Sequence, residues 1–198
     1  MTRRRLIEAF RSDARGATAI EFALVAPVLL LTLMGTFDLG YNMYADSLLQ
    51  GAVQKAARDS TIEGAAANGA LLDDKVTTMV HQIAPQATLD FKRTAYSSFD
   101  DVSEAEDYND VDGNGTCDNG EPFEDANGNG TWDTDRGVNG FGSARDAVLY
   151  SVTITYPRPF PVTRLLGQSS TFSMSAVTVL RNQPFDQQEQ RAKPGNCT

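Results

Sequence analysis

The sequence is poor in the residue types that most enzymes use for chemistry. It has one histidine, His81, and two cysteines among 198 residues. His81 lies in the stretch TMVHQI with no serine, cysteine or carboxylate motif beside it, and the sequence contains no phosphate-binding loop or zinc-ligand spacing. We therefore expect no enzyme and no small-molecule substrate.

Positive charge is missing where it would be needed to bind nucleic acid. The net charge is −9, and residues 100–135 hold 13 of the 26 acidic residues without one lysine or arginine. The arginines gather instead at the start of the chain, with five in the first 15 residues. No basic surface accompanies a plausible docking element, so the sequence excludes nucleic acid as a partner.

Long apolar runs are absent except for one. Residues 17–37 carry a single charge, Glu21, and as a helix they extend about 30 Å, the thickness of the bilayer hydrocarbon core. The arginines before this span and Asp38 after it orient its N-terminus toward the cytoplasm. No small-residue cleavage site follows the span, which excludes a secretory signal peptide. We expect a basic leader at 1–16, a transmembrane helix at 17–37 and an extracytoplasmic domain at 38–198.

The remaining pattern is typical of an α+β domain. Helical spacing continues past the span to about Ser60, and its predicted apolar face holds Leu39, Met43, Leu49, Val53, Ala56 and Ala57. A second helix is predicted over 71–83, and strands are predicted over 87–96, 146–157 and 170–181. Because the strands alternate apolar residues with serine and threonine, we expect the long helix to pack on a half-buried antiparallel sheet. The tail beyond Asn182 is expected to be weakly ordered unless Cys197 fixes it.

An acidic insert at 100–145 contains an internal repeat, with DVDGNGTCD at 110–118 and DANGNGTWD at 125–133. The first copy places oxygen-bearing side chains at positions 1, 3, 5, 7, 9 and 12 of a calcium loop, with glycine at position 6. Its predicted ligands are Asp110, Asp112, Asn114, Thr116, Asp118 and Glu121. The second copy offers Asp125, Asn127, Asn129, Thr131 and Asp133; position 12 is Arg136, which leaves Asp135 to close the loop.

No amphipathic helices flank these loops, which resemble the loop-only calcium repeats of dockerins and thrombospondin type 3 modules. The spacing predicts structural calcium bound at about 10⁻⁴ to 10⁻³ M, as in extracellular modules. The alternative is a solvated acidic loop without metal. Cys117 and Cys197 are predicted to lie where disulfides persist, and they either pair with each other or stay as reactive thiols.

Glu21 is the anomaly of the apolar span, because a carboxylate there is costly without a cationic partner. Cleavage between Gly16 and Ala17 would place a new α-amino group about one helical turn from Glu21. A basic leader that ends in glycine, an apolar helix and a glutamate at the fifth position after that glycine resemble the prepilin class. Glu21 followed by Phe22 resembles the Glu-Phe/Tyr variant of the tight-adherence (Flp) pilus system.

Residues 15–58 as a whole are similar to the TadE-like family of membrane-anchored minor pilins. The resemblance implies a pilin-like domain in the periplasm, an anchor in the bacterial inner membrane, and cleavage between Gly16 and Ala17 by a prepilin peptidase. It also implies that Glu21 guides packing against other pilin or pseudopilin subunits. The related TadG proteins carry a von Willebrand type A metal motif, Asp-x-Ser-x-Ser, which DVSEA at 101–105 does not complete.

Two functional hypotheses follow. In the first, the protein is a structural subunit that is processed after Gly16 and depends on Glu21, whether it enters a surface pilus or stays in the membrane. In the second, an unprocessed anchor holds a calcium-dependent adhesive or binding domain that depends on Asp110, Asp112 and Glu121.

Overall fold

A computed structural model describes residues 15–61, 68–160, 162–165, 167, 169–184 and 186–198; for residues 15–17 and 165 it describes the backbone alone. The chain divides into two compact units. Unit 1 comprises Met1–Met43 and Arg158–Thr171, and unit 2 comprises Tyr44–Pro157 and Phe172–Thr198. Residues 1–14 of the predicted leader lie outside the described residues.

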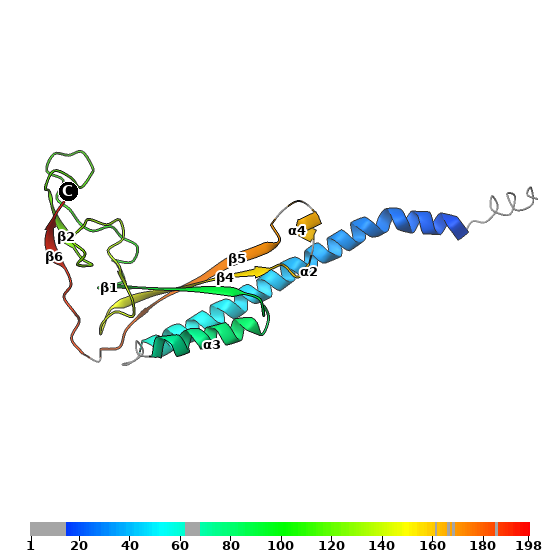
Figure 1. The fold of residues 1–198 in the computed structure, drawn as a ribbon, viewed down its shortest axis with the longest axis horizontal. Coiled ribbons are helices and arrows are strands. Elements are labelled where there is room, and N and C mark those ends of the chain that lie inside the picture. Colours follow the sequence, from blue (N-terminus) through cyan, green and yellow to red (C-terminus); the bar gives the residue numbers. More distant parts are fainter. Residues whose placement is uncertain (1–14, 62–67, 161, 166, 168, 185) are drawn as a thin grey trace, which may run out of the picture. The chain divides into compact units, whose positions relative to one another are not determined.

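The N-terminal helix is as long as the sequence predicts. Helix α2 (Arg15–Ser60) has 46 residues and runs unbroken through Pro27 (Figure 1). Among the described residues, the stretch Thr18–Ser60 is the one helix long and apolar enough to cross a membrane. No residue of its most apolar part is buried, so the helix is compatible with a single-pass membrane anchor.

The buried face of α2 differs from the predicted face at its start. The expected residues Leu49, Val53, Ala56 and Ala57 are buried, together with Ala45 and Ala52. Leu39 and Met43 were predicted on the same face, but they are 61% and 64% exposed, so this part of the prediction is wrong. Asp38 and Asn42 take their place, because steps of four, three and four residues extend the buried stripe through positions 38, 42, 45 and 49.

Helix α3 (Gly69–His81) confirms the helix predicted over 71–83 and lies beside the C-terminal half of α2 in unit 2 (Figure 1). Its buried face presents Leu72, Val76 and Val80. On this helix Asp73 accepts two hydrogen bonds from the Arg93 guanidinium, at 2.5 and 3.1 Å, and one from the Tyr150 hydroxyl at 3.1 Å. These bonds fasten α3 to the sheet.

The predicted antiparallel sheet is confirmed, with strand order β3-β1-β4-β5. Its strands are β1 (Thr88–Tyr96), β3 (Val138–Asn139), β4 (Ala147–Pro157) and β5 (Thr171–Arg181). Strands β1 and β4 pair from Thr88 opposite Thr155 to Tyr96 opposite Ala147. Between β4 and β5, the Thr155 hydroxyl donates to the Ser173 hydroxyl at 3.0 Å.

One face of the sheet forms the core of unit 2. Every second side chain of β4 is almost fully buried: Tyr150, Val152, Ile154 and Tyr156 are at most 1% exposed. Full burial of a valine or isoleucine side chain, such as Val152 or Ile154, contributes about 1.5–3 kcal/mol to folding. The C-terminal half of α2 and α3 run along this sheet (Figure 1), which matches the helix-on-sheet architecture that the sequence predicts.

The C-terminal tail is fixed to the acidic insert. Strand β2 (Pro122–Asp125) pairs antiparallel with β6 (Lys193–Asn196). A disulfide joins Cys117 to Cys197, with Cα atoms 5.3 Å apart, which is within the usual range. The Cys197 amide also donates to the Glu121 carbonyl at 2.8 Å. Cys197 therefore fixes the tail, which is the condition under which the sequence predicts it to be ordered.

Candidate functional site

The acidic insert contains two loops with the same backbone conformation. Residues 97–146 are all described and include no helix, as the sequence predicts. Gly113 and Gly128 have φ angles of +75° and +77°, and Gly115 and Gly130 have +79° and +81°. Residues with a Cβ rarely adopt such angles, so each loop needs glycine at these two positions. The sequence repeat is thus a structural repeat.

In the first loop, side-chain oxygens accept hydrogen bonds from the backbone amides and draw the chain into a tight turn. Asp110 accepts from the amides of Gly113, Asn114 and Gly115 at 2.6, 3.2 and 2.9 Å. Asp112 accepts from the Asn114 amide at 3.1 Å, and Asn114 accepts from the Thr116 amide at 2.7 Å. The side chains at positions 1, 3 and 5 therefore point into one loop.

The second loop repeats these bonds 15 residues later. Asp125 accepts from the amides of Gly128, Asn129 and Gly130 at 2.6, 3.0 and 2.9 Å. Asn127 accepts from the Asn129 amide at 3.0 Å, and Asn129 accepts from the Thr131 amide at 2.7 Å. The amide groups of Asn127 and Asn129 both donate to Asp133, at 2.8 and 2.5 Å.

A buried glutamate closes each loop. In the first, Glu121 is 4% exposed and accepts from the amides of Val111 and Asp118, at 2.6 and 3.4 Å. In the second, Glu106 is 2% exposed and accepts from the equivalent amides of Ala126 and Asp133, at 2.8 and 3.0 Å. Glu106 precedes both loops in the sequence. Its carboxylate nevertheless accepts the same hydrogen bonds in the second loop that Glu121, at position 12, accepts in the first.

The two halves of the insert are related by an approximate two-fold arrangement. Tyr108 and Phe123 form an antiparallel bridge between them. On one side of this bridge the Glu124 amide donates to the Asp107 carbonyl at 2.8 Å, and on the other the Asn109 amide donates to the Pro122 carbonyl at 2.9 Å. This pairing brings each loop next to the glutamate of the other half.

At the end of the second loop, Asp135 is the residue predicted to close it, and Arg136 occupies position 12. Asp135 accepts hydrogen bonds from the Tyr96 hydroxyl at 3.2 Å and the Gly137 amide at 3.0 Å, and it lines an open hollow with Asn127, Asn129 and Asp133. Arg136 pairs with Asp101 at 3.1 Å and with Asp107 at 2.9 Å.

Glu106 is not predicted from the sequence, because a calcium-loop pattern places its closing residue downstream of the loop. The 15-residue repeat itself contains the signal, since Glu106 and Glu121 have the same spacing as the two loops. Trp132 packs edge-on against Tyr108, with ring centroids 5.5 Å apart, and its indole donates to the Glu106 carbonyl at 2.8 Å. Aromatic packing therefore supports the backbone of the closing glutamate.

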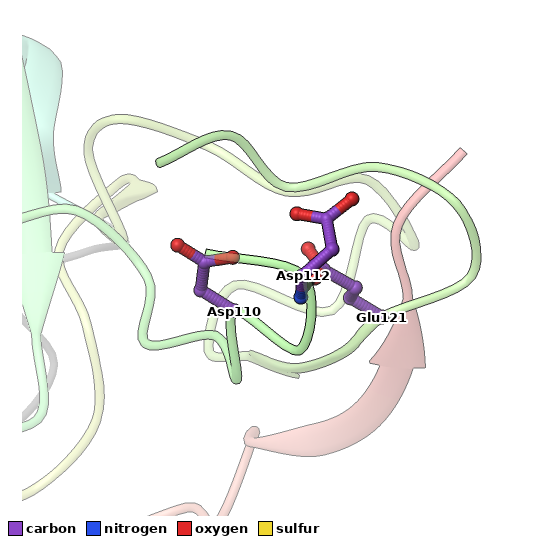
Figure 2. A group of neighbouring side chains, drawn as sticks. All are labelled: Asp110, Asp112 and Glu121. Carbon is purple, nitrogen blue, oxygen red and sulfur yellow. Dashed lines mark hydrogen bonds between the residues drawn. The ribbon is translucent and has the colours of Figure 1, made fainter. Parts of the chain in front are cut away.

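The first loop concentrates negative charge. One carboxylate oxygen from each of Asp110, Asp112 and Glu121 lies within 4.8 Å of the others (Figure 2). Nearby, the pKa of the Tyr108 hydroxyl is raised, first by desolvation and then by the charges of Asp110, Glu121 and Asp118. Closely spaced carboxylates repel one another, so a cation would stabilise this arrangement. A set of hard oxygen donors suits Ca²⁺ better than a transition metal.

The predicted assembly motif lies in unit 1. The backbone of Gly16 and Ala17 belongs to the first turn of α2. Glu21 is exposed, and so is Phe22, at 69%. The motif therefore stands on a helix surface that is open to lipid or to another subunit.

Comparisons with curated proteins and with solved structures find no match for this chain. A comparison with family models does find one, over the part of α2 that contains the glycine, the glutamate and the apolar span. Residues 16–58 match the model described as TadE-like protein, so the N-terminal helix of this chain is TadE-like, as its sequence indicates.

Proposed function

We propose that the protein is a membrane-anchored, non-enzymatic subunit that supports assembly of a tight-adherence (Flp) pilus, as a TadE-like minor pilin or pseudopilin. The family match over residues 16–58 carries this proposal, because it covers the predicted cleavage site, Glu21 and the whole apolar span. In this proposal α2 is a single-pass anchor in the bacterial inner membrane, with its N-terminus in the cytoplasm and residues 38–198 in the periplasm.

Glu21 has a defined task in the proposal. A prepilin peptidase cuts after Gly16 and leaves the α-amino group of Ala17 about one helical turn from Glu21. A carboxylate in an apolar environment needs a cationic partner, and the new amine, on the same chain or on a neighbouring subunit, supplies it. Pairing with the neighbour sets the register between two subunits. The exposed side chains of Glu21 and Phe22 are accessible for such packing.

The deciding experiment is the intact mass and N-terminal sequence of the protein isolated from its native membrane. The proposal expects a chain that begins at Ala17. A chain that begins at Met1 or Thr2 contradicts processing and removes the partner proposed for Glu21. The unprocessed anchor with a binding domain then becomes the better description.

Glu21→Ala tests the assembly role separately from membrane insertion. We expect this variant to insert into the membrane at the level of the parent and to lose pilus assembly. Asp46→Ala is the matched control, because Asp46 is a partly exposed carboxylate on the same helix but outside the apolar span. Assembly at parental levels by Glu21→Ala would refute the role of Glu21.

A second candidate function is a calcium-dependent adhesive or binding domain, and the geometry of the insert supports the calcium part of this proposal. We propose that both loops bind calcium as a structural ion, the first closed by Glu121 and the second by Glu106. The matching hydrogen bonds of the two loops support this proposal. The ion would neutralise part of the 13 carboxylates in residues 100–135 and stiffen the insert.

Trp132 provides the readout for this proposal, because it is the only tryptophan of the chain and contacts Glu106 and Tyr108 within the insert. Calcium added to the full-length protein in detergent is expected to change its fluorescence with a midpoint of about 10⁻⁴ to 10⁻³ M, whereas magnesium leaves it unchanged. A triple replacement of Asp110, Asp112 and Glu121 by the corresponding amides should remove the response of the first loop. An unchanged spectrum in the parent protein would exclude the calcium proposal and favour a solvated acidic insert.

A further inference from the structure

In unit 1 the connection between β4 and β5 meets α2 at the end of its apolar span. The rings of Phe37 and Phe160 stack with centroids 6.1 Å apart and an interplanar angle of 25°. Next to them, Arg158 forms an ion pair with Asp38. Both side chains of this ion pair are largely buried, at 17% and 9% exposed. Two adjacent contacts thus hold the connection against one turn of α2.

This turn is where the membrane span would end. Phe37 is the last residue of the predicted span, and Asp38 is the first charged residue after Glu21. If α2 crosses a bilayer, the connection lies at the depth of the lipid headgroups. The ion pair with Arg158 has a clear use at that depth, because it removes an unpaired carboxylate from the edge of the hydrocarbon.

The composition of the connection matches an anionic lipid surface. In a chain with a net charge of −9, Arg158–Thr171 contains no acidic residue and two arginines, of which Arg158 is paired with Asp38 and Arg164 is left to face the surroundings. Phe160 and Val162 offer partly exposed apolar groups, and the Arg164 side chain is exposed. Segments that lie in the interface between hydrocarbon and water place phenylalanine and aliphatic side chains in the acyl boundary and basic side chains at anionic headgroups.

We propose that this connection is a second membrane contact of the protein. Phe160 and Val162 enter the interfacial layer, and Arg164 binds the phosphates of anionic phospholipids in the leaflet where α2 leaves the membrane. The proposal rests on the membrane anchor of the proposed function. It adds that the chain touches the bilayer surface at a site more than 100 residues away from that anchor in the sequence.

Quenching by brominated phospholipids tests the contact in the full-length protein reconstituted into vesicles that contain phosphatidylglycerol. Each variant adds one tryptophan while Trp132 is retained, so the parent supplies the background. Phe160→Trp reports on the connection, Phe22→Trp on the apolar span, and Phe99→Trp on an exposed loop of unit 2, where Phe99 is 51% exposed. We expect bromines near the headgroups to quench the fluorescence of the tryptophan at position 160. The emission of this tryptophan should also be shifted to the blue, because its ring lies in an apolar layer. Acrylamide in the water should quench the tryptophan at position 99.

The outcomes separate this inference from the anchor. Quenching at position 22 by deep bromines, with position 160 behaving like position 99, overturns the second contact and leaves the anchor in place. No lipid quenching at position 22 or position 160 overturns both.

Reversing the charge of Arg164 gives a second test, which asks whether the lipid contact depends on this arginine and not only on how the new tryptophan packs. In the Phe160→Trp background, Arg164→Glu is expected to lower the lipid quenching and to abolish its dependence on phosphatidylglycerol. Arg181→Glu, an exposed arginine of β5 in unit 2, should leave both unchanged. Equal effects of the two reversals would contradict a specific role for Arg164.

Discussion

Glu106 and Glu121 lie 15 positions apart, and the carboxylate of each closes the loop that belongs to the other's repeat. If the insert is divided into residues 106–120 and 121–135, each half begins with its glutamate and carries its loop four residues later. Because the glutamates are exchanged, neither loop is complete within its own half. The two loops are therefore expected to form and to unfold together.

Glu106→Gln tests this exchange. We expect it to destabilise the insert by about 1–3 kcal/mol, because a buried carboxylate that accepts bonds from three backbone amides loses its charge. Glu121→Gln should cost a similar amount. Urea unfolding followed by Trp132 fluorescence in the presence of a chelator measures both. Glu124→Gln, an exposed glutamate of β2, is the control and should stay within about 0.5 kcal/mol of the parent. A loss at Glu121 without one at Glu106 would contradict the exchange.

Sequence reasoning found the first loop in full and the second in part, for a physical reason. Side chains that point into a tight turn repeat every second residue, so Asp110, Asp112 and Asn114 can be recognised locally. Glu121 closes the first loop at position 12 and is therefore visible locally, but Glu106 reaches the second loop through pairing between two halves of the insert, which a local pattern does not show. The sequence offers Asp135, which lines the hollow beside the second loop, and the structure brings Glu106 to that loop as well.

The face of α2 illustrates the same limit. Apolar spacing identified Leu49 and Val53 correctly, since both pack in the core of unit 2. It failed at Leu39 and Met43 because a polar residue can occupy a buried position when a distant residue pairs with it. Here Asp38 is buried with Arg158, which lies 120 positions away. The pairing of β2 with β6 was likewise missed, since four-residue strands carry too few alternations to be recognised.

Arg93 is expected to be among the residues most sensitive to mutation in unit 2. It forms a bidentate pair with Asp73, and its guanidinium lies 4.5 Å from the ring centroid of Phe141 and 4.2 Å from that of Tyr150. Arg93→Ala leaves the Asp73 carboxylate without this partner and should cost about 3–5 kcal/mol in urea unfolding.

Arg93→Lys should recover little of this loss, because a lysine neither pairs in a bidentate way nor stacks as a flat group. Lys92→Ala, the neighbouring exposed residue of β1, serves as the control and should change stability by less than about 0.5 kcal/mol. A lysine variant as stable as the parent would show that a positive charge at position 93 is sufficient for stability, without the bidentate hydrogen bonds and the stacking of the guanidinium.

Loss of the disulfide should release the tail. Cys117 and Cys197 close a loop with a sequence separation of 80, and the bond holds β6 against β2. Cys197→Ser is expected to destabilise the insert by about 2–5 kcal/mol, as the loss of a native disulfide usually does. Limited trypsin proteolysis with mass spectrometry should then show early cleavage after Arg191, which the parent resists; the bond after Lys193 precedes Pro194 and is not a trypsin site. Equal cleavage rates would mean that the hydrogen bonds of β6 hold the tail without the bond.

Gly195→Ala separates strand pairing from the disulfide. A Cβ atom at position 195 would lie 2.4 Å from the ring of Phe123, so the tail cannot pair closely with β2 unless the ring moves. We expect the tail of this variant to become more sensitive to proteases while the disulfide remains intact by mass. Pairing that survives the extra methyl group would show that Phe123 has room to rotate.

Alkaline pH should destabilise unit 2 through its buried tyrosines. Burial raises the pKa of Tyr150, and the Asp73 carboxylate adds to this against the opposing charge of Arg93; burial and Asp135 raise the pKa of Tyr96. The neutral hydroxyl is therefore favoured in the folded state, while the unfolded chain releases its proton near pH 10. The stabilising contribution is complete below about pH 10 and falls as the pH rises above it, because the unfolded state then binds fewer protons.

Urea unfolding at a series of pH values from about 9 to 11.5 measures the slope of stability against pH. Tyr150→Phe should lower stability near neutral pH, because Asp73 loses the hydroxyl donor, and it should flatten the alkaline decline. Tyr96→Phe should flatten it further when the two replacements are combined. Lysines also titrate in this range, but they are the same in every variant, so the difference between variant and parent isolates the tyrosines. A Tyr150→Phe slope equal to that of the parent would show that the hydroxyl of Tyr150 ionises in the folded protein as easily as in the unfolded chain.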